Sequence, residues 1–240
     1  MEMDWCCTYY DWIDFHRIRW IMKTVIISLG GSVVVQDTIN TDFLKKLKEL
    51  ILKRSERFVI VIGGGKVCRM YQDAARTFSA HTEDMDQIGI AVTRVNAELL
   101  RTVFGDDAYE DVVTNPTRAV QTNKRIIIAS GWKPGFSTDH DAVLLARAYN
   151  ADTVINMTNV DYVYDRDPKE KGAQKIERMD WERLQNIVGT TWKPGLHAPF
   201  DPIATKLGAQ LKLKLILVGS DLKNLSNVLD GKKFIGTVVG

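Results

Sequence analysis

One stretch constrains the fold of this chain more than any other: residues 58–76, which read FVIVIGGGKVCRMYQDAAR. Its first five residues are all apolar, which is typical of a strand that is buried on both faces. Three glycines follow, and residues 66–78 then carry apolar side chains at helical spacing. The sequence therefore predicts a strand, a glycine turn and a helix in succession.

This glycine turn predicts a site for an anion. Gly63, Gly64 and Gly65 lack a Cβ atom, so the turn can adopt positive φ and its backbone N–H groups can approach an anion. The N-terminus of the following helix also favours negative charge. Lys66 and Arg69 lie on one face of the first helical turn and would add positive charge beside the anion, so phosphate is the natural ligand. From this stretch alone, tight packing without any ligand remains an open alternative.

Two further strand-to-loop turns are rich in glycine and small polar residues. Residues 24–29 are predicted as a strand, and Gly-Gly-Ser follows at residues 30–32. Residues 124–130 are predicted as another strand, and the polar loop 131–141 leads from it into a helix over residues 142–149. The start of that helix carries three possible capping residues, Ser137, Thr138 and Asp139.

The rest of the chain alternates between helices and strands as well. Helices are predicted over residues 41–54, 86–104, 180–188, from residue 202 onward and up to residue 231 after an N-cap at Asp221. Strands are predicted over residues 111–113, 153–157, 214–218 and 234–239, with a short hairpin at 158–168. On the helix over 86–104, five apolar residues are expected to face inward: Ile88, Ala91, Val92, Val95 and Leu99. Asp201 is expected to be the N-cap of a helix that begins with Pro202.

Strands that alternate with helices predict an α/β fold, with a mostly parallel sheet covered by helices on both faces. Ligands of such sheets bind beyond the carboxyl ends of the strands, where all three polar turns lie. The turns are therefore expected to meet in one crevice that holds more than one phosphate group. Neither glycine turn is a Walker A motif. The glycines at 63–65 nearly meet a dinucleotide-binding fingerprint, but Cys68 stands where its third glycine should be, which weakens that interpretation.

The composition is that of an ordinary globular chain, with 240 residues, 45% of them hydrophobic and 26% charged. The net charge of +2, spread along the chain, gives no indication of a nucleic-acid partner. No apolar run is long enough to span a membrane. The cysteines and histidines lack the spacing of a disulfide framework or a metal site, so a cytoplasmic protein without a protein-borne metal site is expected.

Residues 1–21 differ from the rest of the chain because their many aromatic residues show no sustained period. We expect residues 22–240 to form a single domain and Met22 to be the natural start, with residues 1–21 as an upstream extension. An arm that docks on another subunit is the alternative. The tetrapeptide Trp-Lys-Pro-Gly occurs at residues 132–135 and again at 192–195, which we treat as coincidence unless both copies line one site.

With these motifs in view, the sequence resembles the amino-acid kinase family, and within it the uridylate (UMP) kinases of the archaeal type. The resemblance covers residues 22–240 and rests on six motifs in the family's order and spacing. They are SLGGS (28–32), IGGGKVCR (62–69), DQIGIAVTRVNA (86–97), GWKPGFSTD (131–139), TNVDYVYDRDP (158–168) and FDPIATKL (200–207). The family implies a three-layer αβα sandwich, transfer of the γ-phosphoryl group of ATP to UMP, Mg²⁺ carried by the nucleotide phosphates, and commonly a homohexamer.

The resemblance also assigns individual residues. It implies that ATP contacts Ser28, that the ATP phosphates contact Gly30, Gly31, Ser32, Gly65 and Arg69, and that the adenosine contacts Thr158, Asn159, Tyr164 and Asp167. It implies that UMP contacts Gly64, Asp86, Gly131, Trp132, Lys133, Pro134, Gly135, Phe136, Ser137 and Thr138, with Asp86 at the ribose hydroxyls. Asp201, Asp139 and Arg69 are implied to support the transfer. From the residues alone, Asp139 and Asp201 could equally be plain N-caps, and Tyr164 could be ordinary hairpin packing.

The chain departs from the family at one position. Many members carry a lysine on the first strand that reaches the transferring group, whereas this chain has Ser28. Because phosphoryl transfer depends on positioning and charge stabilisation, a cation is still expected near the bridging oxygen. The candidates besides Mg²⁺ are Lys66, Lys133, Lys206 and Arg69.

Two alternative functions stay open at this point. The first is another small-molecule kinase of the same fold, acting on isopentenyl phosphate, carbamate or an acylated amino acid. Arg69 and Asp86 favour a nucleotide acceptor over these substrates. The second is a non-catalytic protein that binds a nucleotide or an oxyanion. Serine at position 28 favours that alternative, whereas Asp139 and Asp201 speak against it.

Overall fold

The computed structural model describes residues 22–167, 169–191 and 198–240. The extension at residues 1–21 and the second Trp-Lys-Pro-Gly copy lie outside the described residues, so the expectations made for them are not tested. Within the described part, none of the helices combines the length and the apolar character that a membrane span requires.

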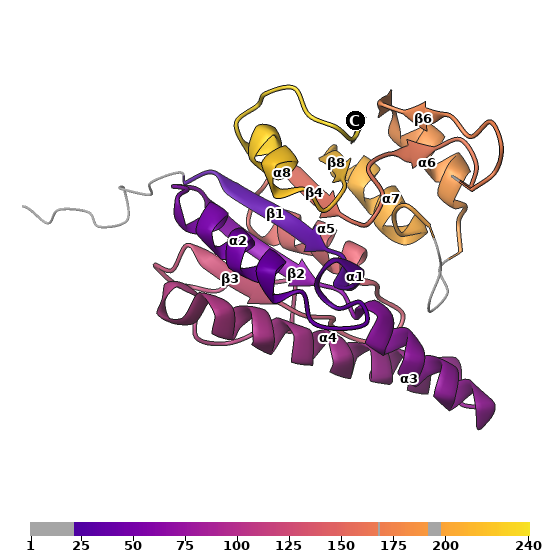
Figure 1. The fold of residues 1–240 in the computed structure, drawn as a ribbon, viewed down its shortest axis with the longest axis horizontal. Helices are drawn as coiled ribbons and strands as arrows, with labels where there is room; N and C mark the ends of the chain where they lie inside the picture. The colour runs from indigo at the N-terminus through magenta and orange to yellow at the C-terminus, as the bar shows by residue number, and fades with distance from the viewer. Residues whose placement is uncertain (1–21, 168, 192–197) are drawn as a thin grey trace, which may run out of the picture.

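A central sheet of seven strands organises the chain (Figure 1). In spatial order, the strands are β3 (Ile126–Ala129), β2 (Arg57–Ile62), β1 (Thr24–Leu29), β4 (Thr153–Met157), β8 (Lys214–Val218), β9 (Thr237–Val239) and β7 (Arg178–Met179). The first five run parallel, and β9 pairs antiparallel with β8 and parallel with β7. The mostly parallel sheet predicted from the sequence is confirmed.

Helices cover both faces of this sheet, as the resemblance implied (Figure 1). One face packs against α1 (Gly31–Val34), α2 (Thr41–Leu52), α4 (Thr82–Phe104) and α8 (Leu222–Leu229). The other packs against α5 (Thr138–Ala148), α6 (Trp181–Val188) and α7 (Pro202–Gln210). Successive residues of β1 alternate between the two cores, since Val25 and Ile27 join one and Ile26 the other. This alternation is the period-two geometry of a strand buried on both faces.

Helix α3 (Gly65–Thr77) and the pair of strands β5 (Val163–Tyr164) and β6 (Lys175–Ile176) lie outside these two layers. Helix α3 follows the second glycine turn and packs along α4. Strands β5 and β6 form a separate antiparallel pair, so the hairpin expected at 158–168 takes its second strand from further along the chain.

Side-chain caps set the starts of several helices. Asn40 accepts a hydrogen bond from the Phe43 N–H group at 3.0 Å, and Asp201 accepts one from the Ala204 N–H group at 2.6 Å. Asp221 caps α8 in the same way. Each bond satisfies a donor that the first turn of a helix would otherwise leave unpaired. The N-caps predicted at Asp201 and Asp221 are therefore confirmed.

Several predicted boundaries are wrong. Helix α5 begins at Thr138 rather than Ala142, because Ser137 caps it, so Asp139 lies in the first turn and is not an N-cap. No strand forms over residues 111–113, where Val113 makes only a single bridge to Ala129. The turn after β1 continues directly into the four-residue helix α1. Helix α4 begins at Thr82, four residues before the predicted start.

The inward face predicted for α4 is wrong at two residues. Val95 is 69% exposed and Ala91 is exposed, whereas Leu100 and Phe104 are fully buried. The helix turns a different face inward because it contacts α2, α3 and β3 together. One apolar stripe of α4 is consequently left uncovered on a single chain.

Candidate active site

The two glycine turns touch one another at the carboxyl ends of β1 and β2. A Cβ atom on Gly31 would lie 2.2 Å from the Gly65 nitrogen and 2.3 Å from the Gly63 oxygen. A Cβ atom on Gly63 would lie 3.6 Å from Oγ1 of Thr138, the first residue of α5. The three loops therefore converge on one crevice. Of the three glycines 63–65, only Gly65 adopts positive φ (69°), so close approach of two backbones explains most of this glycine pattern.

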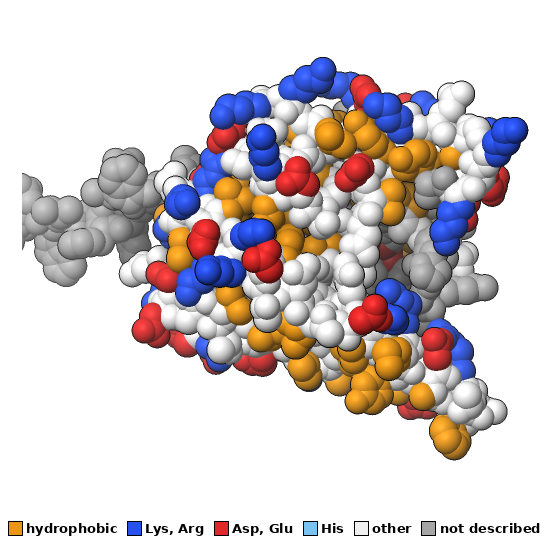
Figure 2. Space-filling view, in the orientation of Figure 1, with side chains coloured by type: hydrophobic (Ala, Val, Ile, Leu, Met, Phe, Trp, Pro, Cys, Tyr) orange, Lys and Arg blue, Asp and Glu red, His pale blue; other side chains and the backbone are white. Residues whose placement is uncertain are grey.

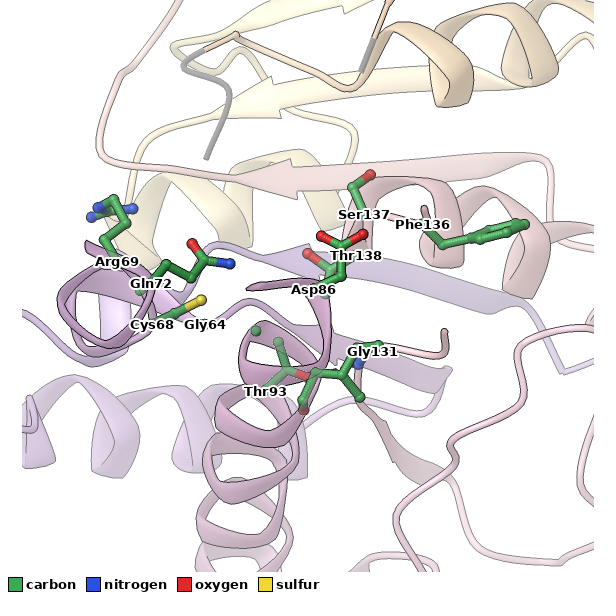
Figure 3. A pocket seen from close by; sticks show the side chains of 13 residues that line it. Gly64, Cys68, Arg69, Gln72, Asp86, Thr93, Gly131, Phe136, Ser137 and Thr138 are labelled. Atoms are coloured by element: carbon green, nitrogen blue, oxygen red, sulfur yellow. Dashed lines mark hydrogen bonds between the residues drawn. The ribbon is translucent and has the colours of Figure 1, made fainter. Parts of the chain in front are cut away.

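A pocket of about 220 Å³ opens beside these turns (Figure 3). Its walls come from α3, α4, the loop after β3 and the start of α5. Six residues assigned to UMP line it: Gly64, Asp86, Gly131, Phe136, Ser137 and Thr138. The other four, Trp132, Lys133, Pro134 and Gly135, are not among its lining residues. Arg69 and Gly65, assigned to the ATP phosphates, also line it, so these assignments share one cavity.

The loop over residues 131–137, called here the acceptor loop, is held by its backbone. Its Gly131 N–H donates to Oγ1 of Thr93 at 2.9 Å, and its Gly135 N–H donates to Oδ2 of Asp86 at 2.8 Å. Both hydrogen-bond acceptors, Thr93 and Asp86, belong to α4. Burial raises the pKa of the Asp86 carboxyl, while the bond from Gly135 works in the opposite direction. Asp86 therefore orders the acceptor loop as well as lining the pocket.

A polar cluster lies at the centre of the same sheet edge. The Ser28 hydroxyl donates to Oδ1 of Asp139 at 2.8 Å, and Nδ2 of Asn156 lies 3.4 Å from the same oxygen. The pKa of the Asp139 carboxyl is raised to about 7, mainly by burial and with a contribution from the charge of Asp201, while the hydrogen bond from Ser28 works in the opposite direction. Asp139 and Asp201, from the first turn of α5 and the start of α7, are thus brought together as predicted transfer residues.

The four candidate cations occupy different surroundings. Arg69 lines the pocket. Lys66 pairs with Asp37 at the surface, and the Lys133 ammonium lies over the Trp132 ring, 4.1 Å from its centroid. Lys206 is exposed on α7. Of the four, Arg69 is therefore the one that the structure sets against the cavity.

The residues assigned to adenosine follow β4, on the other side of the first glycine turn. The Gly30 N–H donates to the Met157 oxygen at 2.8 Å, which joins that turn to the end of β4. Thr158 comes next, but none of Thr158, Asn159, Tyr164 and Asp167 lines the pocket. Along the sheet edge the order is therefore the acceptor loop after β3, the two glycine turns, and then Thr158 after β4.

Sequence reasoning gave no role to several residues of this site. Thr93 holds the acceptor loop, and Nδ2 of Asn96 donates to the Gly63 and Gly64 oxygens at 2.9 and 3.2 Å. Both are buried. The sequence contained a signal for both residues, because Thr93 and Asn96 are polar residues three positions apart on a helix face where Ala97 is buried. Cys68 and Gln72 of α3 also line the pocket (Figure 3).

Comparison with known proteins shows to which family this chain belongs. The family model described as "Amino acid kinase family" matches residues 23–219. The chain belongs to the amino-acid kinase family. Among its relatives is a uridylate kinase of Thermococcus onnurineus, 40% identical over 223 residues, which cover 90% of this chain and 98% of the relative. A uridylate kinase of Methanospirillum hungatei is 35% identical and covers 91% and 95% of the two chains.

Solved structures of the family show the same fold. The crystal structure of a uridylate kinase from Archaeoglobus fulgidus matches with a TM-score of 0.78 and 32% sequence identity, covering 91% of this chain and all of that one. A UMP kinase from Bacillus anthracis matches with a TM-score of 0.72 at 20% identity, which supports the fold alone. The three-layer amino-acid kinase fold is therefore confirmed.

Proposed function

We propose that this chain is a UMP kinase, which transfers the γ-phosphoryl group of ATP to UMP and gives UDP and ADP. The relatives that cover nearly all of the described chain are uridylate kinases. The observation that carries the proposal is the close approach of Gly31, Gly63 and Thr138 to one another beside a pocket lined by Arg69 and Asp86. Such an edge suits two phosphate-bearing ligands that meet end to end.

The order of the loops along the edge supports one orientation of the substrates. We assign UMP to the pocket between α3, α4 and the acceptor loop. We assign the ATP phosphates to the glycine turns, and the adenosine to the segment that begins at Thr158. A phosphate oxygen of UMP then attacks the γ-phosphorus of ATP, and the bond from that phosphorus to the β–γ bridging oxygen breaks as ADP leaves. The chain contributes by positioning these groups and by stabilising their charge.

Arg69 is the residue we assign to charge stabilisation between the two substrates. It lines the acceptor pocket one turn into α3, next to the Gly63–Gly65 turn. The first strand supplies no cation, because β1 contains no Lys or Arg, and its Ser28 is buried and donates its hydroxyl hydrogen to Asp139. A guanidinium beside developing negative charge in a pocket is the kind of group that lowers a transfer barrier.

Mg²⁺ is the cofactor we assign to the reaction. Within residues 22–167, 169–191 and 198–240, no group of three or more His, Cys, Asp or Glu side chains lies close enough together to hold a metal ion. A Mg²⁺ ion would therefore arrive on the nucleotide and take most of its ligands from phosphate oxygens and water, as it does in many kinases. It would neutralise charge on the phosphates.

We also infer that the chain acts as a homo-oligomer, with the hexamer common in the family as the expected form. Apolar side chains gather along the edge of the molecule where α3 and α4 lie (Figure 2). Met70, Tyr71 and Phe78 of this region are 60%, 60% and 85% exposed, and Val95 of α4 is similarly uncovered. Such a gathering of large exposed apolar residues marks an interaction surface.

The direct test is UDP formation from UMP and Mg-ATP, followed by chromatography, with CMP, isopentenyl phosphate and carbamate as alternative acceptors. We expect UMP to be the preferred acceptor. Faster transfer to isopentenyl phosphate or carbamate would identify another kinase of the same fold. Binding of both nucleotides without UDP formation would identify a non-catalytic protein, the function that Ser28 favours.

A further inference from the structure

Asp141 is a buried acid to which no motif and no assigned function gives a role. It lies in the first turn of α5, and its relative exposure is 0%. Its Oδ2 accepts a hydrogen bond from the Trp132 N–H group at 3.1 Å. Its Oδ1 has no hydrogen-bond partner among the described residues.

The surroundings of Asp141 make its burial costly. The charged groups that face it are the carboxylates of Asp139 and Asp201, which repel a charge on Asp141. A buried polar atom without a partner also costs free energy, and an apolar side chain of similar shape would avoid both penalties. A buried carboxyl group that is neither fully hydrogen-bonded nor paired with a cation points to a functional role for the residue.

The hydrogen bond that the Asp141 side chain accepts reaches the acceptor loop at Trp132, near the start of the loop. Trp132 directly follows Gly131, which Thr93 holds, while Asp86 holds the far part of the loop at Gly135. Without Asp141, the Trp132 N–H would lose its acceptor, and α5 would no longer hold this end of the loop.

Contacts between aromatic rings connect Trp132, at the start of the loop, to Phe136, near its end. The Phe136 ring stacks on His140 of α5, with centroids 4.6 Å apart, and meets the Trp132 ring edge to face at 5.0 Å. Phe136 itself lines the pocket. A displacement of Trp132 would therefore also displace Phe136, a residue of the pocket wall.

We propose that Asp141 is a positioning residue, which sets the acceptor loop against the pocket by holding the Trp132 N–H group. Asp141 acts on the acceptor side only, because its bond reaches the loop after β3 and not the segment after β4 that we assign to adenosine. The identity of the acceptor rests on the proposed function, whereas the contact between Asp141 and the loop does not.

Two substitutions at Asp141 and one control separate positioning from general stability. Asp141→Leu keeps the approximate shape of the side chain but removes the carboxyl oxygen that accepts the Trp132 hydrogen bond. If the leucine variant does not fold, Asp141→Ala removes the same oxygen with a smaller side chain. Asp141→Asn keeps an oxygen that can accept the Trp132 hydrogen bond. Asn224→Leu is the matched control, because Asn224 is also buried and bonds backbone groups at Ile235, away from the pocket.

The variants are compared by calorimetric titration of UMP, by KM for UMP and for ATP, and by hydrogen exchange of the peptide over residues 131–137. We expect Asp141→Leu to weaken UMP binding by about tenfold, because the part-buried Trp132 N–H group loses its acceptor and the bound loop is destabilised. Its KM for ATP should stay within about twofold, and its loop amides should exchange faster. Asp141→Asn should remain close to the wild type in all of these measurements.

Three results would overturn the proposal. The first is wild-type UMP affinity and loop exchange in Asp141→Leu. The second is an equal rise of its KM values for UMP and for ATP. The third is a loss of UMP affinity in Asn224→Leu as large as that in Asp141→Leu. If the wild-type chain binds UMP but forms no UDP, the proposed function fails, while titration and exchange still decide the role of Asp141. If it does not bind UMP, the exchange rate at residues 131–137 decides it.

Discussion

Asp139 and Asp201 both stand at helix starts, but the structure gives them different local roles. Asp201 is an N-cap with an intrahelical hydrogen bond. Asp139 is not a cap, and it accepts hydrogen bonds from β1 and β4 instead. Helix capping is therefore one function of Asp201, and a role in transfer has to be separated from it.

Substitution of Asp201 can make that separation. Asparagine caps helices as well as aspartate does, so Asp201→Asn should leave the free energy of unfolding nearly unchanged, whereas Asp201→Ala should lose about 1 kcal/mol. If the charge of Asp201 supports transfer, both variants should lose at least about tenfold in kcat. Urea unfolding and UDP formation measure the two effects. Wild-type kcat in Asp201→Asn would reduce Asp201 to a cap.

Arg69 is the second residue whose role can be tested by itself. We expect Arg69→Ala to lower kcat/KM by about 10²-fold or more, because one charge-stabilising donor in such a site contributes roughly 3 to 4 kcal/mol. The control is Lys66→Ala, since Lys66 pairs with Asp37 at the surface and does not line the pocket. Steady-state UDP formation measures both variants. A near-wild-type Arg69→Ala enzyme would remove Arg69 from the transfer step.

The buried acids predict how stability depends on pH. Burial raises the pKa of Asp139 to about 7 and that of Asp141 to about 8, from an ordinary 3.8. Between about pH 4 and 8 these two carboxyl groups therefore bind more protons in the folded state than in the unfolded state, so their contribution to stability is greatest at the acid side and falls as pH rises. Each group contributes at most about 1.4 kcal/mol per pH unit.

Asp141→Asn tests this dependence, because asparagine does not titrate. Its free energy of unfolding, measured in urea at pH 5, 6, 7 and 8, should fall less steeply with pH than that of the wild type. The two curves should diverge most near pH 8. Parallel curves would show that Asp141 does not titrate in this window.

At the scale of elements, the turns after β1 and β2 depend on glycine for their mutual contact. Gly31→Ala would place a Cβ atom 2.2 Å from a backbone nitrogen that cannot move without displacing α3. We expect a loss of about 2 to 3 kcal/mol in the free energy of unfolding, together with loss of activity.

Gly89 provides the matched control for Gly31. It lies inside α4, and a Cβ atom there would meet the end of the Gln72 side chain at 3.1 Å rather than a backbone atom. Gly89→Ala should therefore be neutral in stability or gain up to about 1 kcal/mol through helix propensity. Equal destabilisation of both variants in urea would contradict the close contact between the two turns.

At the scale of the whole molecule, α3 and α4 form one long edge whose apolar residues stay uncovered on a single chain (Figure 2). If this edge is the contact between copies, a charge at its centre should break the assembly. We expect Val95→Glu to elute as a smaller species than the wild type in size-exclusion chromatography with light scattering. Ile235→Glu is the control, because Ile235 is exposed to 51% near the C-terminus, and it should keep the wild-type size.

Much of the fold could be predicted because its signals are local. The apolar run ending at Ile62, the glycines after it and the helix that follows lie next to one another in the chain, as do the capping residues Asp201 and Asp221 and the helices they begin. Prediction failed where tertiary contacts decide. Val95 belongs to a plausible apolar stripe, but packing against α2 and β3 selected another face of α4.

The sequence by itself determined the order of most of the strands and helices, the position of the glycine turns and the family, because each depends on neighbouring residues or on motif spacing. Only the tertiary structure decided which distant groups meet. Ser28 and Asp139 are 111 positions apart but share a hydrogen bond, and Asp141 reaches Trp132 only because α5 folds back onto the loop before it. Such contacts follow from how the layers pack, which no local pattern encodes.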